Sequence, residues 1–161
     1  MNKEFTVSMS LFFKVTTVIL VVFLVLIGLL VTYNEGNLNP ALFLYWGIVI
    51  PIIIGCHLFS LNKIKVDLNN IYLQSKIKTI VIPINQIENI SRKSQNNLMI
   101  IGARGIYGLI GVSMDNYKCN IKDRTKLIAI ELKNVKYLIS CDHPNEFINT
   151  INTIKNDKKA S

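Results

Sequence analysis

The side chains most often used for catalysis are few in this chain, and their spacing matches no catalytic or metal-binding motif. The two histidines are His57, inside a long apolar run, and His143, at the start of a predicted helix. The three cysteines, Cys56, Cys119 and Cys141, form no CxxC pair and show no metal-ligand spacing. Nucleophilic catalysis needs a nucleophile, a base and an orienting group within hydrogen-bond reach of one another. We therefore expect no enzyme, no metal site and no cofactor, and we interpret the cysteines as reduced, buried apolar residues.

Four glycines recur at every third position in the stretch Ile101–Gly111, which reads IGARGIYGLIG. A phosphate-binding loop would continue into Gly-Lys-Ser or Gly-Lys-Thr, and a dinucleotide site would have Gly-x-Gly-x-x-Gly spacing in a β-α-β unit. Neither pattern is present. We therefore interpret these glycines as residues of tight turns and of close backbone approach.

The remaining chemical signal is positive charge. The chain carries 18 Lys and Arg against 10 Asp and Glu, which gives a net charge of +8. We predict that a lipid- or partner-binding surface is formed by seven basic residues at strand ends and turns: Arg92, Lys93, Arg104, Lys118, Lys122, Arg124 and Lys126. Anionic lipid headgroups attract such residues by about 1 kcal/mol each. The alternative is an ordinary solvated charged face; a nucleic-acid partner is not expected, because no aromatic platform accompanies the charge.

Two apolar runs precede these basic residues and decide where they can act. Val15–Tyr33 contains no Lys, Arg, Asp or Glu, and Ala41–Leu61 contains only His57 as a titratable group other than Tyr and Cys. Helices of these lengths rise about 28–31 Å, which matches the thickness of a bilayer core. The link at residues 34–39 is so short that the helices must be antiparallel neighbours. We predict a two-helix transmembrane hairpin in residues 1–61, with spans at about 15–33 and 41–61.

The positions of Lys and Arg predict the orientation of this hairpin. Lys3 and Lys14 precede the first run, Lys63 and Lys65 follow the second, and the link carries only Glu35. Because basic flanks stay in the cytoplasm, we expect a multi-pass protein with both termini cytoplasmic. A secretory signal peptide is the alternative for the first run, but this run is longer than a signal core and no small-x-small cleavage motif follows it.

After the second run the hydrophobic period changes to two, which is typical of strands with one buried face. We predict about seven short antiparallel strands, with an irregular stretch at residues 102–116, and then a helix that begins near Pro144. One apolar stripe runs along this helix: Phe147, Ile148, Ile151 and Ile154. The expected fold of residues 62–161 is an all-β pleckstrin-homology-like barrel of two roughly orthogonal sheets, capped by the C-terminal α-helix.

Two segments carry a resemblance to a known family. Ile101–Gly111, the basic strand and hairpin after it, and Tyr137–Ile148 (YLISCDHPNEFI) together resemble the bacterial PH domain family, and more narrowly its small members with two N-terminal transmembrane helices. The resemblance covers residues from about 62 to 155. It implies a PH-like fold and a place in the bacterial cytoplasmic (inner) membrane, and it implies no activity.

These observations support one leading hypothesis and an alternative of a different class. The leading hypothesis is a non-enzymatic integral membrane protein whose PH-like domain binds anionic lipid or a protein partner at the cytoplasmic membrane face. The alternative is a membrane-tethered scaffold that oligomerises through this domain, because exposed strand edges pair and tethering raises local concentration. A hydrolase or transferase is a third interpretation, but no catalytic constellation supports it.

Overall fold

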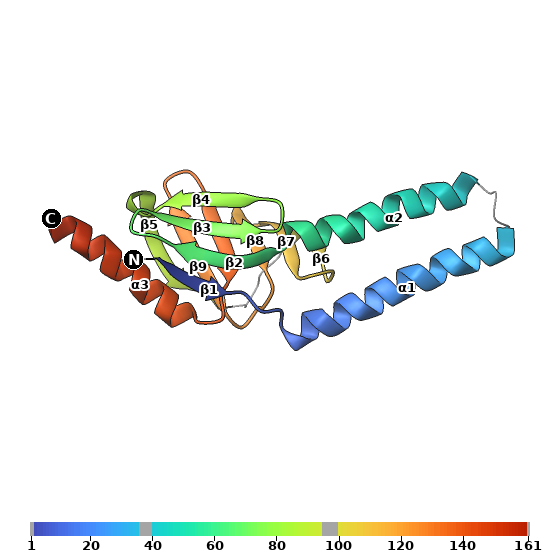
Figure 1. The fold of residues 1–161 in the computed structure, drawn as a ribbon, viewed down its shortest axis with the longest axis horizontal. Coiled ribbons are helices and arrows are strands. Elements are labelled where there is room, and N and C mark those ends of the chain that lie inside the picture. The colour runs from blue at the N-terminus through green and yellow to red at the C-terminus, as the bar shows by residue number, and fades with distance from the viewer. Residues whose placement is uncertain (1, 36–39, 95–99, 161) are drawn as a thin grey trace.

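A computed structural model describes residues 2–35, 40–94 and 100–160 of the chain. Two long helices project side by side from one end of a β domain, and the C-terminal helix lies on the side of the domain away from them (Figure 1). Most of the predicted link at residues 34–39 lies outside the described residues.

The first sheet has four strands in the order β1-β2-β3-β4, and each neighbouring pair is antiparallel. The strands are β1 (Lys3–Thr6), β2 (Leu61–Val66), β3 (Asn70–Ser75) and β4 (Thr79–Pro83). Alternate residues of β2 and β3 are buried, as the period of two predicts. β1 lies beside β2 with Lys3 opposite Val66 and Thr6 opposite Lys63, so the N-terminal residues belong to the β domain.

The second sheet has six strands in the order β5-β9-β10-β8-β7-β6. The strands are β5 (Ile87–Arg92), β6 (Ile100–Arg104), β7 (Leu109–Ser113), β8 (Tyr117–Ile121), β9 (Leu127–Leu132) and β10 (Lys136–Ser140), and the 3-10 turn η1 (Ile84–Gln86) leads into β5. β8 and β10 run parallel, so the prediction of purely antiparallel strands is wrong for this pair. The reason is that β9 and β10 form a hairpin, and β10 rather than β9 takes the place beside β8.

Two clusters of buried side chains hold these sheets together. β9 serves both of them, because Ile128 and Ile130 face the first cluster while Leu127 and Ala129 face the second. The first cluster fills the space between the sheets and is closed by α3 (Pro144–Ala160), whose predicted apolar stripe packs against it. There the rings of Phe5 and Phe147 meet edge-on with their centres 5.2 Å apart. Full burial of a side chain of this size contributes about 1.5–3 kcal/mol, so β1 is held firmly.

The two projecting helices are α1 (Leu11–Glu35) and α2 (Pro40–Phe59). The Tyr45 hydroxyl donates a hydrogen bond to the Leu24 carbonyl at 2.6 Å, which joins the two helices midway. Gly28 lies so close to Trp46 that a Cβ at that position would come within 2.3 Å of the indole ring. Phe13, in the first turn of α1, is buried in the second cluster of the β domain, so the base of this helix is part of the core.

Length and composition identify one helix in the described residues that is able to cross a membrane, Leu11–Tyr33. The apolar part of α2 that the structure describes, Phe43–Phe59, is shorter. The second predicted span also differs at its end, because α2 stops at Phe59 and Leu61 begins β2. One possible span is therefore established here, and the two-span arrangement stays a proposal.

The described residues contain ten strands rather than about seven. β1 was not predicted, because four residues in front of a long apolar run give too short an alternation to stand out. β7 was not predicted, because it lies in the glycine-rich stretch that was expected to be irregular. Gly102 and Gly111 face each other across β6 and β7, and a Cβ on Gly111 would lie 2.1 Å from the Ile101 carbonyl oxygen. These glycines thus permit close strand pairing rather than prevent it.

The position of β1 also changes how the chain is divided. The predicted domain of residues 62–161 omits this strand, which precedes the helices and pairs with β2 after them. The helical pair is therefore an insertion between two neighbouring strands of one sheet.

Candidate functional site

Strand direction divides the loops of the β domain between two ends. We call the end where β1 leads into α1 and α2 leads into β2 the hairpin end. The Ser10 amide donates to the Lys122 carbonyl at 3.0 Å, and the Asp142 amide donates to the Thr6 carbonyl at 3.1 Å, so the end of β10 and the β8–β9 loop lie there too. Strand pairing then places the ends of β5 and β6 at the same end. Six of the seven predicted binding residues have their backbone at the hairpin end: Arg92, Lys93, Arg104, Lys122, Arg124 and Lys126.

Three of these residues line one groove between the end of β5 and the β8–β9 loop. This basic groove has a volume of about 460 Å³ and is lined by Arg92, Lys93, Ser94, Arg124 and Thr125. Arg92 donates a hydrogen bond to the Thr125 carbonyl at 3.4 Å, which joins the two walls. The Arg124 guanidinium lies 5.7 Å from the centre of the Phe13 ring in the first turn of α1. The groove thus lies directly beside the base of the helix that is long enough to cross a membrane.

Lys93 is the most constrained of the three basic groups. Its ammonium lies 3.2 Å from the Asp115 carboxylate and 4.0 Å from the centre of the Tyr117 ring. Burial, followed by the hydrogen bond to Glu131 and the nearby carboxylates, raises the pKa of the Tyr117 phenol to about 12, so the ring stays neutral. Among the residues that the structure describes, Asp115 offsets the charge of Lys93, whereas Arg92 and Arg124 form no ion pair. The uncompensated positive charge of the groove therefore comes from these two arginines.

Residues 62–154 match the model of the family described as bacterial PH domain. The chain belongs to this family. No curated protein and no solved structure matches the chain. PH domains are generally non-catalytic, and in residues 2–35, 40–94 and 100–160 no group of three or more His, Cys, Asp and Glu is placed to hold a metal ion.

Lys126 of the PH domain is engaged in an internal ion-pair cluster. Its ammonium lies 3.1 Å from the Asp142 carboxylate and 3.8 Å from that of Asp123. Burial alone would raise the pKa of Asp142, but hydrogen bonds from Ser8, Thr6 and Lys126 outweigh it and lower this pKa to about 2. The same hydrogen bond raises the pKa of Lys126. Asp142 therefore fastens the segment before α1 to the end of β10, and Lys126, which pairs with Asp142, has little charge left for a ligand.

The other predicted residues are separated from the basic groove. Lys122 is half-buried, and its pKa is lowered by burial and then by the charge of Lys76. Lys118 lies on the face of β8 that looks toward the first sheet and lines a different, apolar cleft. For Arg104 the structure describes the backbone position at the end of β6. Of the seven residues, Arg92, Lys93 and Arg124 line the basic groove, and Lys126 belongs to an internal ion pair. Lys118 and Lys122 lie apart from both, and Arg104 is placed only by its backbone position.

Residues that sequence reasoning missed attach the helices to the PH domain. The turn between β6 and β7 lies between the two helix bases, with Gly105 at φ 95° and packed against Thr16 and Leu20 of α1. The buried Thr17 hydroxyl lies 2.9 Å from the Gly105 carbonyl and accepts a hydrogen bond from the Tyr107 amide at 3.0 Å. A threonine inside an apolar run carries no local signal of such a contact.

Proposed function

We propose that this protein is a non-enzymatic integral membrane protein whose PH domain binds anionic lipid headgroups at the cytoplasmic face of the bacterial inner membrane. The observation that carries the proposal is the contact of Arg124 with Phe13 at the base of α1. If α1 enters the bilayer just beyond this contact, the basic groove lies at headgroup level. A well-placed Arg or Lys at that level contributes about 1 kcal/mol of binding free energy.

The strand pairing supports a membrane hairpin with two spans. β1 precedes α1, β2 follows α2, and these strands are hydrogen-bonded neighbours in one sheet. A chain that crosses the bilayer in α1 must therefore return before β2 begins. α2 has 20 residues, and a helix of this length rises about 30 Å, the thickness of the hydrocarbon core. In this arrangement α1 and α2 cross together.

The charge distribution supports an orientation with the PH domain and both termini in the cytoplasm. Lys14 lies at the base of α1, and the hairpin end of the β domain is basic. Glu35, an acidic residue, lies at the other end of α1, away from the β domain. A fluorescent protein fused to the C-terminus should then fold and emit, and an alkaline phosphatase fused there should be inactive. An active phosphatase fusion together with a dark fluorescent fusion would show the opposite orientation, with the C-terminus outside the cytoplasm.

The lipid proposal is tested on the full chain in detergent by native mass spectrometry. The protein is titrated with short-chain phosphatidylglycerol and, in a parallel series, with short-chain phosphatidylcholine. Wild type should prefer phosphatidylglycerol and lose this preference in high salt. The variant Arg92→Gln with Arg124→Gln should bind phosphatidylglycerol about thirtyfold more weakly, because two contacts of about 1 kcal/mol each are lost.

The matched control removes the same charge elsewhere. Lys133 lies in the turn between β9 and β10, and Lys158 lies near the end of α3, both away from the hairpin end. Lys133→Gln with Lys158→Gln should bind phosphatidylglycerol as wild type does. Unchanged phosphatidylglycerol binding by the double arginine variant would exclude the basic groove as the lipid site. An equal loss of affinity in both double variants would show that only net charge matters.

One observation favours the scaffold function as a second candidate. β6 ends the strand order of the second sheet, and Ile101 on β6 lies opposite Val112 on β7, with 77% and 45% of these residues exposed. Exposed apolar side chains on the last strand of a sheet are typical of surfaces that pair. The same mass spectra report oligomeric state: dimers that Ile101→Lys removes would support assembly, and a monomer at all concentrations would exclude it.

A further inference from the structure

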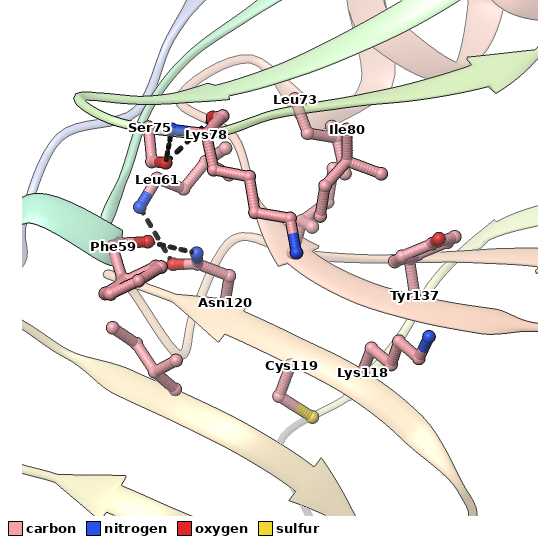
Figure 2. A pocket seen from close by; sticks show the side chains of 12 residues that line it. Phe59, Leu61, Leu73, Ser75, Lys78, Ile80, Lys118, Cys119, Asn120 and Tyr137 are labelled. Atoms are coloured by element: carbon pink, nitrogen blue, oxygen red, sulfur yellow. Dashed lines mark hydrogen bonds between the residues drawn. The ribbon is translucent and has the colours of Figure 1, made fainter.

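A second cleft opens between the two sheets of the PH domain (Figure 2). Its volume is about 190 Å³. Leu73 and Ile80 of the first sheet form one wall, and Ile110 and Ile139 of the second sheet form the other. An apolar cavity of about 150 Å³ is enough to stay dry and to bind a molecule the size of benzene. This cleft therefore has room for a short apolar segment of a ligand.

Two polar side chains inside the cleft are already satisfied. The Asn120 side chain accepts a hydrogen bond from the Leu61 amide and donates one to the Phe59 carbonyl, both at 2.9 Å. The Ser75 hydroxyl donates to the Lys78 carbonyl at 2.8 Å. These groups fix the junction of α2 with β2 and the turn between β3 and β4, so they are not available to a ligand.

The mouth of the cleft, in contrast, carries free positive charge. Lys78 and Lys118 are both exposed, and neither ammonium has an ion-pair partner in the part of the chain that the structure describes. Lys118 and Tyr137 lie opposite each other on the parallel strands β8 and β10. Figure 2 shows the Lys78 side chain reaching across the opening from the β3–β4 turn, while Lys118 and Tyr137 lie together on the opposite wall. Two ammonium groups and a phenol thus surround one apolar opening.

The cleft also adjoins the helical pair. Phe59, the last residue of α2, is 48% exposed and lines the cleft. A flexible chain that leaves the cleft past Phe59 therefore runs along the base of α2, toward the membrane in the proposed arrangement.

We propose that this cleft binds a free fatty acid drawn from the membrane. The carboxylate accepts hydrogen bonds from Lys78, Lys118 and Tyr137, and the first part of the chain lies between the apolar walls. The rest of the chain, for which the cleft has no room, passes Phe59 and stays in the bilayer. A single-chain ligand with one compact anionic head matches both the small volume and the paired ammonium groups. The inference rests on the proposed membrane anchor but not on the basic groove.

The test uses the full chain in phosphatidylcholine nanodiscs that contain palmitic acid with a photoactivatable diazirine in its chain. After illumination, mass spectrometry locates the labelled residues. We expect label on Leu73, Ile80 or Ile110 as well as on α1 and α2. Lys78→Gln with Lys118→Gln should lower the cleft label at least tenfold, which is the loss expected for charge-assisted hydrogen bonds, and Ile110→Trp should lower it by filling the space.

Three comparisons decide between this inference and its alternatives. Arg92→Gln with Arg124→Gln should leave the cleft label unchanged, which separates this site from the basic groove. Phosphatidylcholine that carries the diazirine should label the helices and not the cleft; equal cleft labelling would overturn the choice of a fatty acid. Fatty-acid label on the helices alone, or cleft label that the lysine variant retains, would overturn the site. If neither the fatty acid nor the phosphatidylcholine probe labelled the helices, the proposal that α1 and α2 anchor the protein in the membrane would be overturned instead.

Discussion

The two ends of the β domain are built from the same strands but carry different charge. Loops and strand ends at the hairpin end hold eight basic residues: Lys76, Lys78, Arg92, Lys93, Arg104, Lys122, Arg124 and Lys126. Loops and strand ends at the far end hold three acidic and three basic residues, whose charges cancel: Asp67, Glu88, Asp115, Lys3, Lys133 and Lys136. Exposed charges contribute little to the stability of a fold, so folding alone does not require this difference. It is the difference expected if one end faces an anionic membrane and the other faces the cytoplasm.

Two carboxylates at the hairpin end depart from this pattern, and both are neutralised internally. Asp123 caps its own loop by accepting hydrogen bonds from the amide and hydroxyl of Thr125, and Asp142 binds Ser8 and Lys126. Their role is to hold the loops, whereas Arg92 and Arg124 remain open to a ligand. The comparison therefore distinguishes residues that build the hairpin end from residues that act there.

The largest effect is expected at Asp142. A lowering of its pKa from 3.8 to about 2 corresponds to a stabilisation of about 2–3 kcal/mol, and Asp142→Asn should lose most of it at pH 7. Because the folded pKa lies below the unfolded one, this contribution is complete above about pH 4 and disappears as the pH falls through about 2. Thermal unfolding of the full chain in detergent, followed by circular dichroism, measures the difference between variant and wild type.

The pH dependence provides the control for this prediction. The gap in melting temperature between wild type and Asp142→Asn should narrow steadily from pH 4 to pH 2. Asp67, an acidic residue of the far end, has no such ion pair in the described residues, and Asp67→Asn should change the melting temperature little. A constant gap at all pH values would show that Asp142 acts through packing rather than through its charge.

A smaller effect should follow from moving charge between the ends. The triple variant Arg92→Gln, Arg124→Gln, Glu88→Lys keeps the net charge of +8 but transfers two positive charges to the far end. It should bind phosphatidylglycerol about thirtyfold more weakly than wild type, as the double arginine variant does, because about 1 kcal/mol is lost at each arginine. The native mass spectrometry titration measures this. Recovery of wild-type affinity would mean that net charge, and not the hairpin end, attracts the lipid.

The smallest effect concerns the attachment of the helices to the hairpin end. Thr17→Val removes the hydroxyl that the Tyr107 amide donates to, at a cost of about 1 kcal/mol. Hydrogen exchange at the Tyr107 amide should then accelerate by about fivefold. Thr16→Val is the matched control, because the Thr16 hydroxyl donates only within α1, to the Phe12 carbonyl. Equal acceleration in both variants would show that the turn does not depend on Thr17.

Much of the local structure could be predicted from the sequence. The alternation in Tyr117–Ile121 predicts β8 with its observed bounds, and the stripe that includes Phe147 and Ile151 predicts the buried face of α3. The candidate site was less accessible. Six of seven basic residues converge on one end because strand direction carries them there, yet only three line the basic groove. Lys126 pairs with Asp142, sixteen positions further along the chain, and Lys93 pairs with Asp115, twenty-two positions further along. No local sequence pattern indicates pairs at such separations.

The sequence by itself determined the apolar run long enough to cross a membrane, the alternating strands and the amphipathic final helix, because each is a periodicity within a few consecutive residues. Only the tertiary structure decided that β1 joins β2 across the inserted helices, that β8 and β10 run parallel, and that Lys78 and Lys118 meet at one cleft. Strand partners are chosen by the apolar area that the whole domain buries, and Phe5 reaches Phe147 only when the chain has closed on itself. Local pattern defines the elements, and burial summed over the whole domain defines how they are arranged.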